Sequence, residues 1–143
     1  MSRGIRFFKE NTKYIVKNKG NLRSWIALAI AEESKKAGEL SFILCDDNFL
    51  AELNFGFLKH KRLTDILTFP TSEKPETVSG EIYISLERVK ENACFYHQPL
   101  EVELQRVMIH GILHLIGYDD RSVEEKEIMR AKENYYLDKL VNR

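Results

Sequence analysis

Two histidines, a glycine and a pair of aspartates lie within one short segment, His110-Gly-Ile-Leu-His114-Leu-Ile-Gly117-Tyr-Asp119-Asp120. Helical residues four positions apart are separated by about 40° around the axis and about 6 Å along it, so both imidazoles can reach one metal ion. Gly117 can take the left-handed backbone that ends a helix, and the chain can then return so that Asp119 or Asp120 supplies a third ligand. Three protein ligands leave a position for water, as in catalytic zinc sites. The pattern therefore predicts a hydrolytic metal centre with a coordinated water as the nucleophile.

The position after the first histidine separates this pattern from the zinc peptidases. In their H-E-x-x-H signature a glutamate follows the first histidine and acts as general base. Here Gly111 occupies that position, and no other residue of the chain presents itself as a general base. The substrate is therefore expected to be something other than a peptide, although a zincin-like metallohydrolase or peptidase stays open as an alternative. Two core histidines without a metal are the plainer interpretation, which the glycine and the carboxylates disfavour.

The histidines belong to a predicted helix from Pro99 to Ile116 that is apolar on almost every side. Such a helix is buried on several sides. Gly111 suits a place where a sheet or another helix packs closely, because a side chain there would fill the gap. We therefore expect the metal site at the end of a central buried helix, where ligand geometry can be held tightly.

Short strands and helices alternate along the rest of the chain. Strands are predicted at residues 5–8, 40–45, 64–69 and 80–85, with a loop at 71–79. Further helices are predicted from Asn21 until Gly38 stops it, after the turn at 46–48, over 86–96, and from Ser122 with Glu125 as a capping box. Two of these helices have an apolar inner face, made of Leu22, Trp25, Ile26, Ala29 and Ile30 in one and Ile128, Met129, Tyr136, Leu137 and Leu140 in the other. The expected class is α+β, a small mixed four-stranded sheet packed with about five helices.

Bulk composition is that of an ordinary globular protein. The 143 residues fit a single domain spanning 1–143, with 43% apolar residues. Lysine plus arginine and aspartate plus glutamate both total 22, so contact with nucleic acid must come from local patches. No apolar run is long enough to span a membrane, and charges interrupt residues 1–19, so no membrane association and a cytoplasmic location are expected. Cys45 and Cys94 form no CxxC and are expected to be buried free thiols.

A family resemblance extends these predictions. Ten positions from His110 to Asp119 match the pattern H-G-x-L-H-L-x-G-Y-D of the YbeY endoribonucleases, and the chain resembles that family. Leu53-Asn54 with T-D-I-L-T-F-P at 64–70, and G-E-I-Y-I-S at 80–85, are similar to two further blocks of the family in the same order. The resemblance implies a metal-dependent endoribonuclease that acts on single-stranded RNA in 16S rRNA 3′-end maturation and ribosome quality control. Its implied partners are an rRNA precursor and the ribosome or small-subunit proteins.

By this resemblance His110 and His114 are zinc ligands, and Asp120 stands where most members have a third histidine. Aspartate is a legitimate zinc ligand, and its harder oxygen would tolerate Mn²⁺ or Fe²⁺ better than a third imidazole does. Asp119 matches the family's own aspartate and is assigned to orienting the turn or supporting the ligands, with ligation as the alternative.

A second departure from the family lies just before residue 64. The family's tyrosine-arginine pair falls at Phe57 and Leu58, so an arginine regarded as functionally important is missing. Lys59, Lys61 and Arg62 could supply positive charge for RNA phosphates instead, and Arg121 is a further candidate. A solvated basic loop is the alternative for the first three, and a surface role for Arg121. Because the arginine is missing and the third ligand is substituted, a non-catalytic ribosome-associated binding module with a structural metal is a second alternative function.

Overall fold

A computed structural model describes residues 4–58 and 64–141 of the chain. In chain order its elements are β1 (Ile5–Glu10), α1 (Lys19–Glu32), β2 (Lys36–Cys45), α2 (Asp47–Leu58), β3 (Ile66–Pro70), β4 (Thr77–Ser85), α3 (Leu86–Phe95), α4 (Leu100–Ile116) and α5 (Val123–Val141). The described residues thus form four strands and five helices, and the α+β prediction is confirmed. None of these helices is long and apolar enough to cross a membrane.

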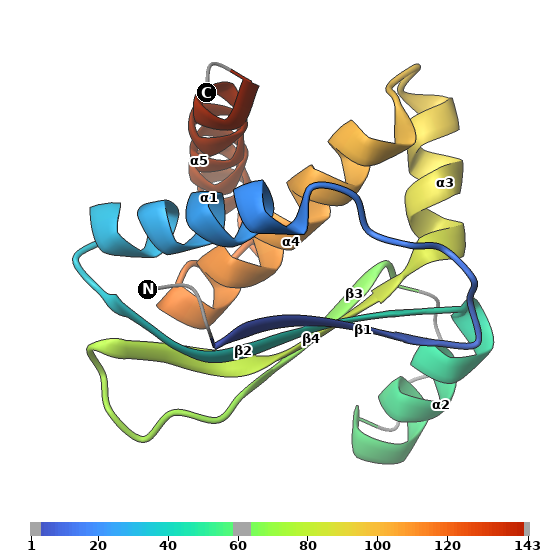
Figure 1. Ribbon diagram of the computed structural model, residues 1–143, viewed down its shortest axis with the longest axis horizontal. Coiled ribbons are helices and arrows are strands. Elements are labelled where there is room, and N and C mark those ends of the chain that lie inside the picture. The colour runs from blue at the N-terminus through green and yellow to red at the C-terminus, as the bar shows by residue number, and fades with distance from the viewer. Residues whose placement is uncertain (1–3, 59–63, 142–143) are drawn as a thin grey trace.

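The four strands form one mixed sheet in the order β1-β2-β4-β3. β1 and β4 both run parallel to β2, and β3 runs antiparallel to β4. α1 and α4 lie over the same face of the sheet, α5 packs on these two helices, and α2 lies at one end of the sheet (Figure 1). The mixed sheet is as predicted, and it provides the floor on which the histidine-bearing helix rests.

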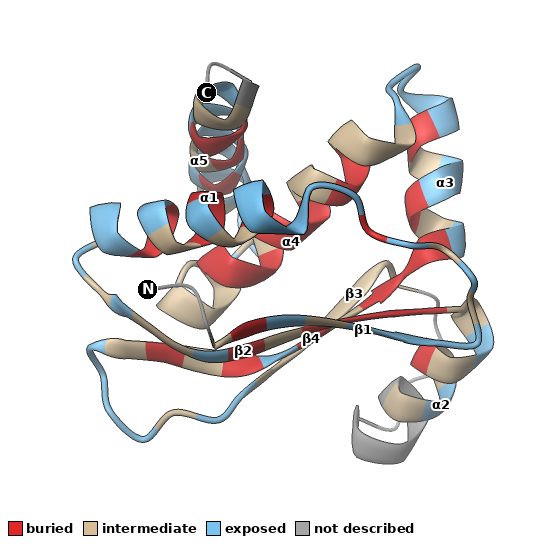
Figure 2. Ribbon diagram, viewed as in Figure 1, coloured by how far each residue is buried: buried red, intermediate tan, exposed pale blue. Residues whose placement is uncertain are grey.

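That helix, α4, is the central element of the fold. It contacts β3, β4 and the helices α1, α3 and α5, and its middle turns are buried (Figure 2). A Cβ atom on Gly111 would lie 2.8 Å from Ile66 Cδ1 and 2.9 Å from Ile82 Cγ2. Because no real Cβ contact is that short, the missing side chain lets α4 lie directly against the sheet, as the sequence predicted.

The start and the end of α1 differ from the prediction. Its buried face consists of the five predicted residues, but the helix begins at Lys19 after Asn18, whose backbone is left-handed, so Asn21 lies inside the helix. It ends at Glu32, before the predicted stop at Gly38, and Ser34 just after it has a left-handed backbone. Gly38 lies in β2 instead, where a Cβ atom would overlap the Ser79 hydroxyl. β4 likewise starts earlier than predicted, at Thr77, which shortens the predicted loop.

The amino-terminal end of α5 has the predicted capping box. The Glu125 amide donates to Ser122 Oγ at 3.0 Å, and the Ser122 amide donates to Glu125 Oε1 at 2.9 Å. Met129, Tyr136 and Leu137 are buried as predicted, whereas the prediction for Ile128 was wrong, since it is 52% exposed.

Buried contacts elsewhere complete the core. Trp25 is fully buried in α1 and its indole N–H donates to the Tyr136 carbonyl at 2.7 Å, which joins α1 to α5. Cys45 is a buried free thiol as expected, but Cys94 is exposed because it lies on the outer side of α3.

Candidate metal centre

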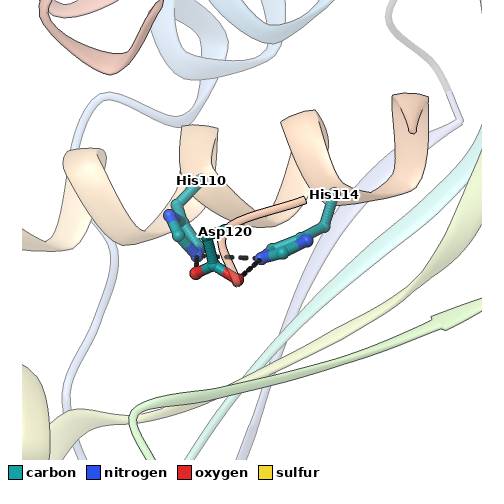
Figure 3. Close-up of side chains that lie close together, drawn as sticks. All are labelled: His110, His114 and Asp120. Atoms are coloured by element: carbon teal, nitrogen blue, oxygen red, sulfur yellow. Dashed lines mark hydrogen bonds and ion pairs between the residues drawn. The ribbon is translucent and has the colours of Figure 1, made fainter. Parts of the chain in front are cut away.

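His110, His114 and Asp120 converge on one point beside the last two turns of α4 (Figure 3). The two histidine Nε2 atoms are 3.1 Å apart. Asp120 Oδ2 lies 3.4 Å from His110 Nε2, and Asp120 Oδ1 lies 3.6 Å from His114 Nε2. All three side chains are partly exposed, Asp120 by 39%, so the point where they meet can be reached from solvent.

The spacing of these atoms fits a metal ion. A tetrahedral zinc site with bonds of about 2.0–2.1 Å has ligand atoms about 3.3–3.4 Å apart. The separations of 3.1, 3.4 and 3.6 Å lie on both sides of that value, the last two being from the two different oxygens of Asp120. Two imidazole nitrogens and one carboxylate oxygen are also a donor set that Zn²⁺ accepts, and the carboxylate suits Mn²⁺ or Fe²⁺ as well. The residues present therefore fit a divalent transition-metal ion.

Glu133 of α5 sets the orientation of the first histidine. Its Oε2 lies 2.6 Å from His110 Nδ1, and its Oε1 accepts from Arg106 Nη1 at 2.9 Å. Because an ionised carboxylate only accepts hydrogen bonds, Nδ1 carries the proton and Nε2 presents its lone pair to the centre. Glu133 is only 7% exposed at its side chain, and Arg106 compensates its charge. This is the carboxylate–histidine arrangement that supports metal ligands.

Charges around His110 and Glu133 shift both pKa values. Burial works to lower the pKa of His110, but the hydrogen bond and charge of Glu133, with Asp120 and Asp65 further away, outweigh it and raise the pKa. Burial works to raise the pKa of Glu133, but hydrogen bonds from His110 and Arg106 outweigh it and lower the pKa. The pair is therefore held as a charged acceptor facing an imidazole N–H.

Asp120 reaches the centre through a turn that Gly117 begins. Gly117 has φ of +130°, and the amides of Gly117 and Tyr118 both donate to the Leu113 carbonyl, at 3.1 and 3.0 Å. The positive φ confirms the predicted role of this glycine in ending the helix. Tyr118 then fixes the turn, because its hydroxyl donates to Glu33 Oε1 at 2.6 Å. The candidate third ligand, Asp120, therefore lies on a turn that is tied to the end of α1.

Glu33 accepts hydrogen bonds from several side chains. Besides Tyr118 it accepts from the Tyr136 hydroxyl and from Lys132 Nζ, the latter at 2.9 Å, and Lys132 also lies over the Tyr118 ring. Burial works to raise the pKa of Glu33, but the hydrogen bonds from the two tyrosines and Lys132 outweigh it and lower the pKa. We call Glu33, Tyr118, Lys132 and Tyr136 the Glu33 cluster.

The other candidates from the sequence fall outside this convergence. Asp119 is exposed and is not one of the three converging residues, and Arg121 lies at the surface with its Nε 3.9 Å from Asp119 Oδ1. Lys59, Lys61 and Arg62 lie outside the described residues. Gly111 faces the sheet, which leaves the general-base position of a zinc peptidase without a side chain.

Sequence reasoning missed both supporting carboxylates. Glu133 is a charged residue on the buried face of α5, four residues after Met129 and four before Leu137. A charge at such a position is rarely buried unless it has a partner, so this interruption of the apolar face was a usable signal. Glu33 gave no comparable signal, because it follows the last turn of α1.

A cleft of about 730 Å³ opens beside the centre, between α3, α4 and α5. His110 and Asp120 line it together with Asp65, Glu103, Glu133 and Tyr96. Burial raises the pKa of both Asp65 and Glu103. The centre is therefore open on one side to a space of the size that small ligands occupy, about 300–1,000 Å³.

Comparisons with known proteins cover this whole site. The sequence model of the family described as endoribonuclease YbeY matches residues 7–141. An endoribonuclease YbeY of Cytophaga hutchinsonii is 44% identical over 133 residues, 93% of each chain. One of Flavobacterium psychrophilum is 45% identical over 129 residues, 90% of this chain and 86% of its own. The solution structure of a Thermotoga maritima protein superposes with a TM-score of 0.67 at 34% identity, covering 95% of this chain and 88% of the other.

Proposed function

The chain belongs to the YbeY family of endoribonucleases, and on that premise we propose that it hydrolyses RNA at a metal ion held by His110, His114 and Asp120. Membership makes it a metal-dependent hydrolytic nuclease. The observation that carries the proposed site is the convergence of three ligand atoms within 4.8 Å of one another, at the end of a helix pinned to the sheet. We also propose that residues 1–143 form one catalytic domain.

We propose Zn²⁺ as the ion, with Mn²⁺ or Fe²⁺ as alternatives that the carboxylate ligand permits. When bound, such an ion polarises a phosphodiester oxygen and makes water a better nucleophile. The protein's own contribution is to hold the ligands. Glu133 keeps His110 in the tautomer whose Nε2 faces the centre, and Gly117 and Tyr118 return Asp120 to it. The partial exposure of all three ligands leaves room for a phosphodiester.

The substrate we propose is single-stranded RNA, in particular the 3′ end of a 16S rRNA precursor. The proposed partners are the ribosome or its small-subunit proteins, and the proposed location is the cytoplasm. Lys59, Lys61, Arg62 and Arg121 are proposed phosphate contacts, since neutralising phosphates requires charge near the strand and no fixed geometry.

Metal analysis of the purified protein, combined with cleavage of single-stranded RNA with and without a chelator, tests this function. We expect bound metal and chelator-sensitive cleavage in the wild type, and loss of both in His114→Ala. A matched control is His97→Asn, which removes an exposed histidine away from the three candidate ligands. His97 has a left-handed backbone, which asparagine adopts readily. Full metal content and activity in His114→Ala would refute the proposed site, and metal without any cleavage by the wild type would favour a structural metal.

The third ligand has its own test. Asp120→His restores the family's more common donor, so we expect zinc binding to be retained or strengthened. Loss of zinc from this variant, with the fold intact, would reject Asp120 as a ligand. Cleavage of casein that a chelator abolishes would revive the peptidase alternative.

A further inference from the structure

The cleft beside the centre extends well beyond the three ligands. We call it the α3–α5 cleft, bounded by Asn92 and Tyr96 on α3 and its carboxyl end, by Arg106 and His110 on α4, and by residues 123–134 on α5. At about 730 Å³ it can hold more than the reacting phosphodiester. A strand of RNA bound at the centre therefore has space there for a neighbouring nucleotide.

Two cations on α5 face this cleft, and the charge of Arg130 acts on Glu103 across it. Lys126 and Arg130 are exposed and one helical turn apart, so they project from the same face of the helix. Within the part of the chain that the structure describes, neither side chain forms an ion pair or hydrogen bond. Lys132 and Lys139 of the same helix are by contrast paired, with Glu33 and Glu32. Lys126 and Arg130 are thus available to an anionic ligand.

Carboxylates in the cleft limit how much RNA it can hold. The charge of Glu133 is compensated by Arg106, and its other oxygen is hydrogen-bonded to His110. Burial raises the pKa of Glu103 and Asp65, which disfavours their charged forms. Glu127, which also lines the cleft, is exposed and offsets one of the two cations. The cleft therefore suits one or two phosphates next to the ion, and not a long tract of backbone.

Tyr96 adds an aromatic surface to the same cleft. Its side chain is 54% exposed, and its ring meets the neighbouring Phe95 ring edge to face at a centroid distance of 5.0 Å. Exposed tyrosines bind single-stranded nucleic acid by stacking on bases, which a duplex keeps covered. An aromatic ring beside unpaired cations is the combination used by single-strand binding surfaces.

We propose that the α3–α5 cleft is the subsite for the nucleotide adjoining the scissile phosphodiester of single-stranded RNA. Tyr96 stacks on its base, while Lys126 and Arg130 contact its phosphates. This inference rests on the proposed function, because it takes the strand to run from the metal centre into the cleft.

The test is the double variant Lys126→Ala/Arg130→Ala, compared with Lys9→Ala/Lys19→Ala, which removes the same charge from β1 and the start of α1. Metal-loaded proteins are assayed for kcat/KM on a short labelled single-stranded RNA over a series of salt concentrations, with metal content measured in parallel. We expect kcat/KM of the cleft variant to fall roughly tenfold at low salt with metal content unchanged. Its log–log salt slope should flatten by about 1.4, that is about 0.7 for each lost phosphate contact.

A second pair of variants tests the stacking. Tyr96→Ala should reduce kcat/KM on single-stranded RNA roughly tenfold, whereas Tyr96→Phe, which keeps the ring, should stay close to the wild type. If the wild type cleaves RNA but the cleft variants match the Lys9/Lys19 control, the subsite is wrong and the proposed function stands. If the metal-loaded wild type cleaves no RNA, both are wrong.

Discussion

The histidines and the aspartate of the centre are held by different parts of the molecule. His110 and His114 lie on α4, which packs against the sheet at Gly111. Glu133 Oε2 accepts a hydrogen bond from His110 Nδ1 at 2.6 Å. Asp120 lies in an irregular segment after Gly117, and the residues on either side of it are anchored. Tyr118, two residues before it, bonds to Glu33, and the Arg121 amide, directly after it, donates to Glu125 Oε1 at 3.1 Å. Support for the histidines is therefore direct and buried, and support for the aspartate is indirect.

This difference indicates which parts of the centre can change. A helix packed against a sheet fixes the spacing of its side chains, so the histidine pair is set by the core itself. A ligand on a turn can adjust when its side chain changes in length. By the resemblance, the position where the family more often has histidine is the one on the turn. The difference in support gives a physical reason to expect that this position accepts an aspartate.

Removing the direct support that Glu133 gives to His110 should have the largest effect on metal affinity. Glu133→Gln keeps the shape of the side chain but removes the charged acceptor of His110 Nδ1, and loss of such a partner weakens metal binding about 10–100-fold. Competition with a chromophoric chelator measures the affinity. Glu127→Gln, an exposed change on the same helix, is the control, and equal affinities of the two variants would contradict the role of Glu133.

Removing the indirect support that Tyr118 gives to Asp120 should lower metal affinity by less, and only while Asp120 is present. Tyr118→Phe removes only the hydroxyl that reaches Glu33, and we expect metal affinity to fall about threefold, within the free energy of one hydrogen bond. Tyr135→Phe is the matched control, because the Tyr135 hydroxyl on α5 donates to Glu32, the neighbour of Glu33, at an exposed site away from the turn.

Double variants separate the support of His110 by Glu133 from the support of Asp120 by Tyr118. In an Asp120→Ala background, Tyr118→Phe should cost no further affinity, since it acts through the missing ligand, whereas Glu133→Gln should still weaken binding. A full additional loss from Tyr118→Phe in that background would show that the Glu33 cluster supports the whole fold and has no particular effect on the third ligand.

The smallest effect concerns stability against pH. Hydrogen bonds lower the pKa of Glu33 in the folded protein despite its burial, so the unfolded chain takes up a proton more readily. The stabilisation from Glu33 is therefore present above about pH 4.5 and is lost as the pH falls through the lowered folded pKa. Glu33→Gln lacks this dependence, so its deficit in unfolding free energy relative to the wild type should shrink on acidification. Urea unfolding at a series of pH values measures it, and a deficit that grows towards acid would contradict the assignment.

The local parts of this site could be predicted from sequence, and its long-range parts could not. The histidine spacing, the Gly117 turn and the Ser122 capping box depend on residues within four positions of one another, and the structure reproduces each arrangement. Glu133 is 23 residues from His110, and Glu33 is 85 residues from Tyr118, so these pairs depend on how α1, α4 and α5 pack.

The predicted ends of α1 were wrong for a related reason. Asn21 and Gly38 have the residue types that cap and stop helices, yet Asn18 and Ser34 take left-handed backbones at those ends. Gly38 is required for a different purpose, because Ser79 of β4 leaves no space for a side chain beside β2. A glycine thus marked a close approach between strands, which residue type alone does not distinguish from a helix stop.

The hydrogen bond from Trp25 to the Tyr136 carbonyl also gives the protein an optical probe. Trp25 is the only tryptophan in the chain, it is fully buried, and it is bonded to the helix that carries Glu133. Its fluorescence should shift to longer wavelength when α5 separates from α1 and water reaches the indole. Emission spectra can therefore show, without any label, whether α5 stays docked while metal is added to or removed from the centre.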